Sequence, residues 1–151
     1  MRTVLQRVAN ASVHVGGTCV GAIDRGVLLL VGIGRGDTEA DADRTVKKIA
    51  RLRCFPGRTP MDLTLGDVGG GCLVVSQFTL HATLKAGNRP GFAEAEAPEV
   101  AERLYERVAA GLAAEGLEVA RGVFGAHMEI QLTADGPVTL LIETQHGRLL
   151  R

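Results

Sequence analysis

The sequence predicts a single α/β domain with two packed mixed β-sheets and two main helices. The chain has 151 residues, of which 46% are hydrophobic, so it can bury one sizeable core. Segments with the apolar pattern of strands lie before, between and after two segments with helical periodicity. Because two helices cannot cover both faces of about seven strands, we expect the sheets to pack on each other.

The N-terminal part of the chain is expected to be β-structure. The side chains of residues 4–8 alternate with the period of a strand. Gly16 and Gly17 separate residues 12–15 from residues 18–23, which is a hairpin signal. Residues 27–33 are apolar almost throughout, as is typical of a strand that is buried on both faces.

Two segments are predicted to be helices. Asp37 and Thr38 can cap the first, in which the apolar residues between Val46 and Leu52 fall on one stripe. Pro98 suits the first turn of the second helix, and Gly116 suits its end. Lys and Arg side chains occupy the other face of the first helix, which we interpret as a solvated surface, with a contact to a nucleic-acid backbone as the alternative.

The remaining segments are expected to alternate between strands and loops. No internal repeat or linker is visible, so residues 1–151 are expected to form one domain with a frayed tail at 145–151. The predicted elements are a strand over 72–80, a loop over 85–92, and strands over 119–133 and 138–144 that are joined by a Gly-Pro turn.

Charge and cysteine content restrict the partners and the compartment. Seventeen basic and seventeen acidic residues cancel, which argues against a tight, sequence-blind binder of nucleic acid, and we expect no DNA partner. A protein that contacts only the end of an RNA remains compatible with this balance. Three widely spaced cysteines favour a reduced, cytoplasmic protein. The longest apolar stretch, residues 26–34, is far shorter than a spanning helix of about 20 residues, so no membrane association is expected.

Metal and cofactor sites are not indicated. The four histidines are scattered, and with the cysteines they make no spacing typical of metal ligands. Gly69, Gly70 and Gly71 are not followed by the Lys-Ser/Thr pair of a phosphate-binding loop. Cys72 follows these glycines at the start of an apolar strand, where a cysteine usually packs in the core. We therefore expect no metal and no cofactor.

Residues 76–80, Ser-Gln-Phe-Thr-Leu, form the first candidate site. They follow an apolar run, so polar groups begin where a strand is expected to end, and backbone N–H groups at such a point can converge on an oxyanion. Thr79 offers a hydroxyl but has no obvious base nearby. In a strand, His81 would share its face at about 7 Å, which does not support a catalytic triad. Taken alone, the segment also fits an ordinary strand with a partly exposed threonine.

Residues 135–139, Asp-Gly-Pro-Val-Thr, form the second candidate site. An X-Pro bond adopts the cis form far more readily than other peptide bonds, and the sequence leaves the isomer open. Gly136 has no Cβ to crowd either isomer. Such a turn fixes the position of its carbonyl oxygens without any dependence on side-chain rotamers. On its own, a Gly-Pro pair indicates only a turn.

The two segments together resemble the D-aminoacyl-tRNA deacylase family, whose pattern is a Ser-Gln-Phe-Thr-Leu segment and a later Gly-Pro motif. Similarity extends along nearly the whole chain, and matches in the expected order are more specific than any single one. The further matches are residues 5–8 with 11–13, Lys85 with residues 87–90, and residues 122–128.

The resemblance implies an esterase that cleaves the bond between a D-amino acid and the 3′-terminal adenosine of tRNA. It also implies a homodimer, in which Gly136 and Pro137 of one subunit reach into the pocket of the other. Their carbonyl oxygens would stand where the side chain of an L-amino acid must go, so L substrates would be rejected by a clash. Glycine has no side chain to clash, so some cleavage of glycyl-tRNA is expected. Arg7, by the same resemblance, would hold this turn in place.

The resemblance also assigns roles around the ester. Gln77, Phe78 and Thr79 would be the catalytic segment, with backbone N–H groups as oxyanion donors and Ser76 beside the substrate. Thr79 would be a nucleophile or a positioning group; we favour the second, because the 2′-hydroxyl of the terminal ribose can help to activate water. The remaining contacts would be made with adenine by Ala126 and Met128 and with phosphate by Lys85 and Arg89.

Two other classes of function stay open at this point. One is a module that binds the acceptor end of tRNA without cleaving it. The other is an esterase with a small-molecule substrate.

Overall fold

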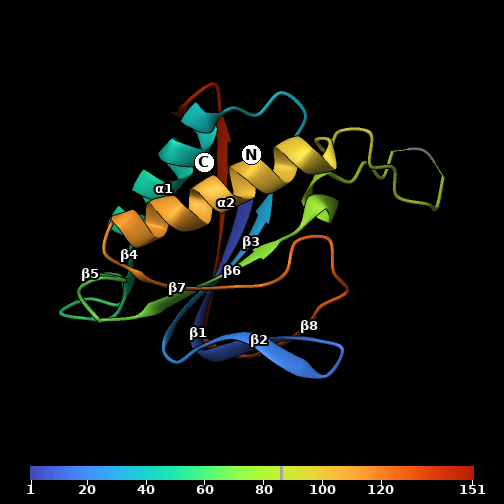
Figure 1. Cartoon of the computed structure of the whole chain (residues 1–151). Coiled ribbons are helices and arrows are strands. Elements are labelled where there is room, and N and C mark those ends of the chain that lie inside the picture. The colour runs from blue at the N-terminus through green and yellow to red at the C-terminus, as the bar shows by residue number, and fades with distance from the viewer. Residues whose placement is uncertain (86) are drawn as a thin grey trace.

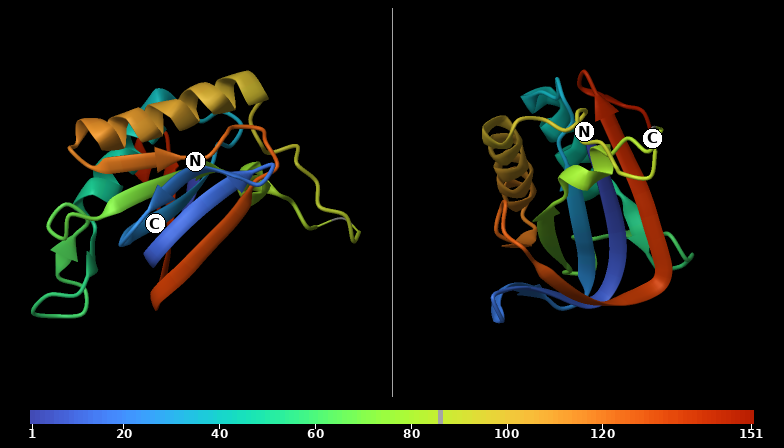
Figure 2. Two further views of the ribbon diagram at one scale, coloured as in Figure 1. Left: turned by 60° about the horizontal axis from the view of Figure 1, so that its bottom comes forward. Right: turned by 90° about the vertical axis from the view of Figure 1, so that its right-hand side faces the viewer.

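The computed structural model describes residues 1–85 and 87–151; Ala86, which belongs to the predicted loop 85–92, lies outside the described residues. Two helices cover one face of a curled mixed sheet (Figures 1 and 2). The elements in chain order are β1 (Arg2–Val15), β2 (Thr18–Ile23), β3 (Gly26–Gly32), α1 (Glu39–Arg51), β4 (Arg53–Phe55), β5 (Leu63–Thr64), β6 (Gly71–Ser76), the 3₁₀ turn η1 (Phe78–His81), α2 (Pro98–Ala114), β7 (Glu118–Arg121), β8 (Glu129–Gln145) and β9 (Arg148–Leu149).

The main sheet has the strand order β7-β6-β3-β1-β8-β9, with β2 paired to β1. The β3–β6 and β6–β7 pairs are parallel, whereas β1 runs antiparallel to β2, β3 and β8. The longest strands, β1 and β8, pair with each other along most of their length, and β8 bends sharply (Figure 2). The α/β class with two helices is thus confirmed, and its two packed layers arise from one sheet that curls on itself, with β4 and β5 as a separate small pair.

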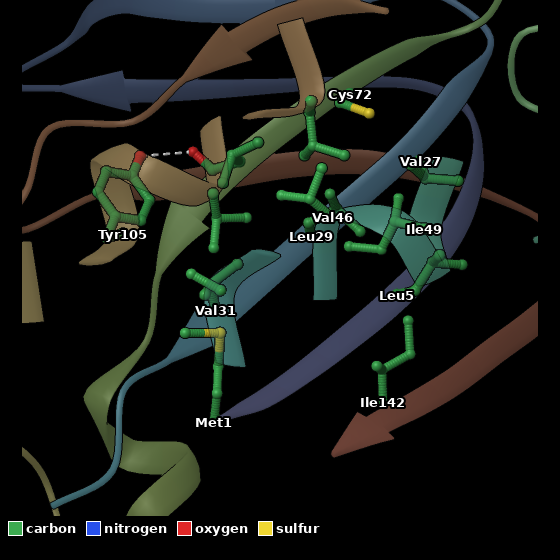
Figure 3. Packing of buried hydrophobic residues seen from close by; sticks show 14 of the residues in the cluster. Met1, Leu5, Val27, Leu29, Val31, Val46, Ile49, Cys72, Tyr105 and Ile142 are labelled. Atoms are coloured by element: carbon green, nitrogen blue, oxygen red, sulfur yellow. Dashed lines mark hydrogen bonds between the residues drawn. The ribbon is translucent and has the colours of Figure 1, made fainter. Parts of the chain in front are cut away.

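The curl creates two hydrophobic cores on opposite faces of β3. Val27, Leu29 and Val31 face the helices and pack in the larger core (Figure 3). Leu28, between them, packs in the second core together with Leu73 of β6. This arrangement explains the continuous apolar run in residues 27–33, because both faces of the strand are buried.

The ends of both helices follow the sequence signals. Both the backbone N–H and the hydroxyl of Thr38 donate to the Asp41 carboxylate at 2.9 Å, which closes the start of α1. Pro98 is the first residue of α2. Gly116, with φ of 84°, lies just beyond its end.

Three expectations about secondary structure are wrong. The strand predicted over 72–80 ends at Ser76, and η1 follows it. The strand predicted over 119–133 is interrupted, because Gly125 has φ of 73° and Ala126 N–H donates to the Val123 carbonyl in a turn. The frayed tail is instead ordered against β8: the Glu143 N–H donates to the Arg151 carbonyl, and the Leu150 N–H donates to the Glu143 carbonyl.

Candidate functional site

The chain changes direction at the end of β6. The Gln77 N–H still donates to the Val31 carbonyl of β3 at 2.9 Å, as in a ladder. Gln77 itself has φ of −146° and ψ of 79°, and the next four residues form η1. The four predicted residues Ser76, Gln77, Phe78 and Thr79 therefore lie at the point where a buried strand emerges at the surface.

This geometry leaves two N–H donors without partners. Phe78 and Thr79 are the first residues of η1, whose hydrogen bonds begin with the Leu80 N–H. Across residues 1–85 and 87–151, neither N–H has an acceptor. Adjacent free donors of this kind can bind the oxyanion that forms when a carbonyl group is attacked.

The side chain of Thr79 has a defined partner. The Gln77 side-chain amide donates to the Thr79 hydroxyl oxygen; Thr79 is exposed and Gln77 is half-buried. In the described part of the chain, no carboxylate, imidazole or amine is bonded to this hydroxyl, so nothing there activates it as a nucleophile. The arrangement suits a hydroxyl that positions a bound group.

Two side chains anchor η1 to the sheet. The Nε2 atom of the buried His81 lies 3.1 Å from the Gly32 carbonyl, which can only accept, so this nitrogen carries the proton. Burial lowers the pKa of His81 below its ordinary value, and the hydrogen bond to Gly32 opposes this shift. Arg2 donates to the Leu80 carbonyl at 2.9 Å and also pairs with Glu143. Strand β1 and the end of β8 thus help to fix the turn.

A cavity of about 380 Å³ opens beside residues 76–78, between the end of β6 and the start of α2. Four of the five aromatic residues of the chain line it, and two of them, Phe78 and Phe92, meet edge to face with ring centroids 5.0 Å apart. Its walls are Val31, Ile33, Ser76, Gln77, Phe78, Phe92, Ala95, Glu96, Pro98, Ala101, Tyr105, Phe124 and Gly125.

Tyr105 forms a neutral part of the cavity wall. Its hydroxyl donates to the Val74 carbonyl at 2.8 Å (Figure 3), and burial raises its pKa to about 12. Cys72 is wholly buried, and burial raises its pKa to about 12 as well, so it does not supply a thiolate. These values leave neither group suited to acid–base or nucleophilic chemistry at neutral pH.

Phe124 and Gly125 line the cavity, whereas the predicted residues Ala126 and Met128 are not among its walls. Met128 packs against the second core, with its sulfur atom over Gly122. Sequence reasoning overlooked Tyr105, Phe92 and Phe124. Aromatic residues are only 3% of the chain, so each is conspicuous in the sequence, but only the fold shows that these three share one cavity.

The Gly136-Pro137 peptide bond is cis and lies within β8. Ala134 pairs with Val8 and Thr139 pairs with Gln6, so the intervening residues bulge out of the ladder opposite Arg7 alone. The predicted turn between two strands is therefore a bulge in one strand. Gly136 and Pro137 are exposed in the single chain.

Arg7 holds this bulge from the inside of the molecule. Its Nε atom lies 3.2 Å from the Asp135 carbonyl oxygen and 3.0 Å from the Asp135 carboxylate. A Cβ atom on Gly136 would stand 3.0 Å from the Arg7 Nη2 atom. The Nη1 atom donates to the Cys54 carbonyl at 2.6 Å, and only 8% of the side chain is exposed. The guanidinium thus joins the bulge to β4.

The two candidate segments do not come together within one chain. Ser76 is level with Val31 on β3, which is level with Thr3 on β1. The bulge lies opposite Arg7, farther along β1. About four residues along the strand and three strand spacings separate them, roughly 20 Å. Figure 2 shows η1 and the bend of β8 at opposite ends of the sheet.

No group of three His, Cys, Asp or Glu residues is placed to hold a metal ion within the described residues. Among the helices of residues 1–85 and 87–151, none combines the length and apolar character needed to cross a membrane.

A family model described as D-Tyr-tRNA(Tyr) deacylase matches residues 4–143. The chain belongs to this family. It is 51% identical over 146 residues to a D-aminoacyl-tRNA deacylase of Desulfitobacterium hafniense, which covers 96% of this chain and 98% of the relative. It is 49% identical over 152 residues to a D-aminoacyl-tRNA deacylase of Chloroflexus aurantiacus, with 100% and 95% coverage. The predicted family and its class of enzyme, a deacylase that hydrolyses an ester, are confirmed.

Two solved structures share the fold of this deacylase family member. One is titled c-Myc DNA Unwinding Element Binding Protein and superposes with a TM-score of 0.89 at 37% identity, covering 96% of this chain and 99% of the other. The other is a probable eukaryotic D-amino acid tRNA deacylase with a TM-score of 0.76, 19% identity, and coverage of 93% and 97%. The second likeness concerns the fold alone.

Proposed function

We propose that this chain hydrolyses the ester between a D-amino acid and the 3′-terminal adenosine of tRNA, and that it rejects L-amino acids with the main chain of Gly136 and Pro137. The observation that carries the proposal is the Gly136-Pro137 bulge, which is exposed in the single chain and held from within by Arg7. A rigid main-chain projection of this kind is suited to a neighbouring pocket.

The cleavage step needs few side chains. Water attacks the carbonyl carbon of the ester, and the N–H groups of Phe78 and Thr79 donate to the resulting oxyanion. The carbon–oxygen bond to the ribose then breaks, and the 3′ oxygen leaves with a proton. Thr79 positions the ester through its hydroxyl, which accepts from Gln77. The 2′-hydroxyl of the terminal ribose assists the water, because among the described residues no carboxylate, imidazole or amine is bonded to the Thr79 hydroxyl.

The cavity supports binding of the terminal adenosine. Its aromatic walls offer flat faces and edges on which a base can stack. Phe124 and Gly125 belong to the same segment as Ala126 and Met128, for which contact with adenine remains our prediction. Ser76, beside the cavity, remains a predicted substrate contact.

Rejection of L substrates requires repulsion. D- and L-amino acids carry the same groups, so attraction alone separates them poorly, and a clash must do so. The carbonyl oxygens of Gly136 and Pro137 would occupy the place of any L side chain, whatever its chemistry. A glycyl ester has nothing to clash and is expected to be cleaved to some degree.

We infer a homodimer from the separation of the two segments. Roughly 20 Å of sheet lies between the bulge and residues 76–79 of the same chain, so the bulge that enters a pocket must come from a second copy. Each dimer would then contain two complete sites. We also propose that residues 1–151 act as a single deacylase domain and that it works in the cytoplasm, where aminoacylated tRNA is used and its three free thiols stay reduced.

The decisive experiment compares D-Tyr-tRNA with L-Tyr-tRNA incubated with the purified protein. Rapid loss of the D ester alone supports the proposal. No loss of either ester would favour a module that binds the acceptor end without cleavage. Equal loss of both would indicate a general esterase, including one whose natural substrate is a small molecule.

The name of the 37% identical solved structure says that it binds a DNA unwinding element. We propose the end of tRNA, and not DNA, as the partner of this chain, because its 17 basic and 17 acidic residues leave no net positive field. A gel-shift titration with duplex DNA at physiological salt is expected to show no specific complex.

A further inference from the structure

The segment between α1 and β6 packs behind the Gly136-Pro137 bulge. In this β4–β5 arm (residues 53–70), the Phe55 carbonyl accepts from the Asp62 N–H at 2.9 Å, and the two short strands pair. The arm lies at one side of the molecule, below the end of α2 (Figure 1). Cys54 and Phe55 are its inner residues, and both are fully buried.

The arm contacts Arg7 on the side of the guanidinium away from the bulge. The Cys54 carbonyl accepts from Arg7 Nη1 at 2.6 Å. The centroid of the Phe55 ring lies 5.9 Å from Arg7 Cζ, and it lies 5.3 Å from the Cζ atom of Arg25. Two guanidinium groups therefore lie over one buried ring, at distances where the cation–π attraction acts.

Cys54 and Phe55 fix the orientation of the Arg7 guanidinium, which in turn contacts the bulge. A guanidinium has a fixed fork, so when Nη1 and the ring set its plane, the Nε atom has only one direction in which to donate. That direction leads to Asp135, next to Gly136. The far face of Arg7 is thus fixed by a carbonyl group and a ring that belong to neither candidate segment.

We propose that Phe55 is a positioning residue for chiral discrimination, which acts through Arg7 on the Gly136-Pro137 bulge. This inference rests on the proposed function. Phe55 touches no part of the cavity, so a change there should alter the rejection of L esters while the cleavage of D esters continues.

Phe55→Leu tests the proposal, because leucine keeps an apolar side chain and removes the π face. The readout is the discrimination ratio, defined as kcat/KM for D-Tyr-tRNA divided by kcat/KM for L-Tyr-tRNA. We expect this ratio to fall about fivefold through faster cleavage of L-Tyr-tRNA. Ile49→Val, in the same core but on α1, is the matched control and should lower Tm without moving the ratio.

A double-mutant cycle separates positioning from general loosening. In an Arg7→Lys background, Phe55→Leu should change the ratio less than twofold, because the guanidinium it acts on is already gone. If Phe55→Leu does not fold, Arg25→Met, at an exposed side chain, removes the other cation from the ring and should lower the ratio in the same direction.

Two results would overturn the inference: an unchanged ratio in a folded variant, or a Phe55→Leu effect that adds fully to Arg7→Lys. Failure of the proposed function itself would look different, because the wild-type protein would then show no preference for the D ester.

Discussion

Arg7 lies between two segments that are far apart in the sequence, and its nitrogen atoms face both. One side of the guanidinium faces Asp135 and Gly136, and the other donates to the Cys54 carbonyl. The geometry of the proposed L-rejecting bulge therefore depends on the shape of this side chain as well as on its charge.

Arg7→Lys tests this dependence. Lysine keeps the charge but cannot donate in two directions from one plane, so the bulge should lose its fixed position. We expect L-Tyr-tRNA to be cleaved about tenfold faster, which corresponds to about 1.4 kcal/mol of lost discrimination. D-Tyr-tRNA should be cleaved at nearly the wild-type rate. Single-turnover deacylation of both esters measures the effect, and an unchanged L rate would show that Arg7 does not set the bulge.

Thr79 allows the contributions of its hydroxyl and its N–H to be separated. Thr79→Pro removes the N–H at a position in the first turn of η1, where proline is tolerated, and should lower kcat for D-Tyr-tRNA by about 10²–10³-fold. Thr79→Ala removes only the hydroxyl and should cost about tenfold, as expected for one positioning hydrogen bond. If alanine is as damaging as proline, the hydroxyl is the nucleophile and the assignment of the N–H groups is wrong.

For individual residues of the candidate site, the sequence was predictive where the residues are adjacent in the chain. The segments 76–80 and 135–139 could be selected because each breaks an apolar pattern with unusual local chemistry. Phe92, Tyr105 and Phe124 could not be grouped in this way, because only the fold brings them to one cavity. The predictions for Ala126 and Met128 followed a motif, and the cavity wall is formed by their neighbours.

At the scale of the elements, the position of η1, which carries the Phe78 and Thr79 N–H donors, depends on contacts with the strands of the sheet. His81 binds β3, and Arg2 of β1 binds the Leu80 carbonyl. The charged groups that act on His81 are Arg2, Asp37 and the N-terminal amine. Their net effect with burial is to favour the neutral ring.

The low pKa of His81 predicts a pH dependence of stability. Below the pKa of an unfolded histidine, about 6.5, the unfolded chain binds a proton that the folded chain resists, so stability falls as the pH falls. Above that value the contribution of the neutral ring is fully present. Between pH 7 and pH 5, Tm should decrease more in the wild-type protein than in His81→Gln, which can still donate to Gly32. Equal slopes in the two proteins would contradict this account.

Both helices could be predicted because their signals are local: a capping residue at Thr38, and Pro98 at a first turn. The partner of Thr38 is Asp41, which the sequence analysis did not name. The end of β6 could not, because apolar Leu80 continues the apparent alternation while the backbone at Gln77 already leaves the strand. The bulge in β8 was also hidden, since β1 pairs with both of its flanks, and such pairing is not local.

In the molecule as a whole, the segment proposed to cleave the ester, residues 76–79, lies far from the Gly136-Pro137 bulge proposed to reject L-amino acids. One curled sheet holds η1 at one end and the Gly136-Pro137 bulge at the other (Figure 2). The sequence predicted the class of fold and its layers, but the joining of the layers into a single sheet depends on the length of β1 and β8, which pair along most of their length.

A subunit-mixing experiment tests the arrangement in trans. Arg7→Lys subunits retain a working pocket, and Thr79→Pro subunits retain an intact bulge. When the first are refolded with an excess of the second, each working pocket should receive an intact bulge from its partner. Cleavage of L-Tyr-tRNA per working pocket should then return to the low wild-type level. Persistent cleavage of the L ester in the mixture would show that the bulge acts on its own chain.

The most direct test of rejection by the main chain compares glycyl-tRNA with L-alanyl-tRNA, whose amino acids differ by one methyl group. If carbonyl oxygens occupy the place of an L side chain, that methyl must clash, since close-packed protein groups have no room for an added carbon. We expect glycyl-tRNA to be cleaved and L-alanyl-tRNA to react at least about 100-fold more slowly, a difference of about 2.8 kcal/mol. Cleavage of both esters at similar rates would contradict the account.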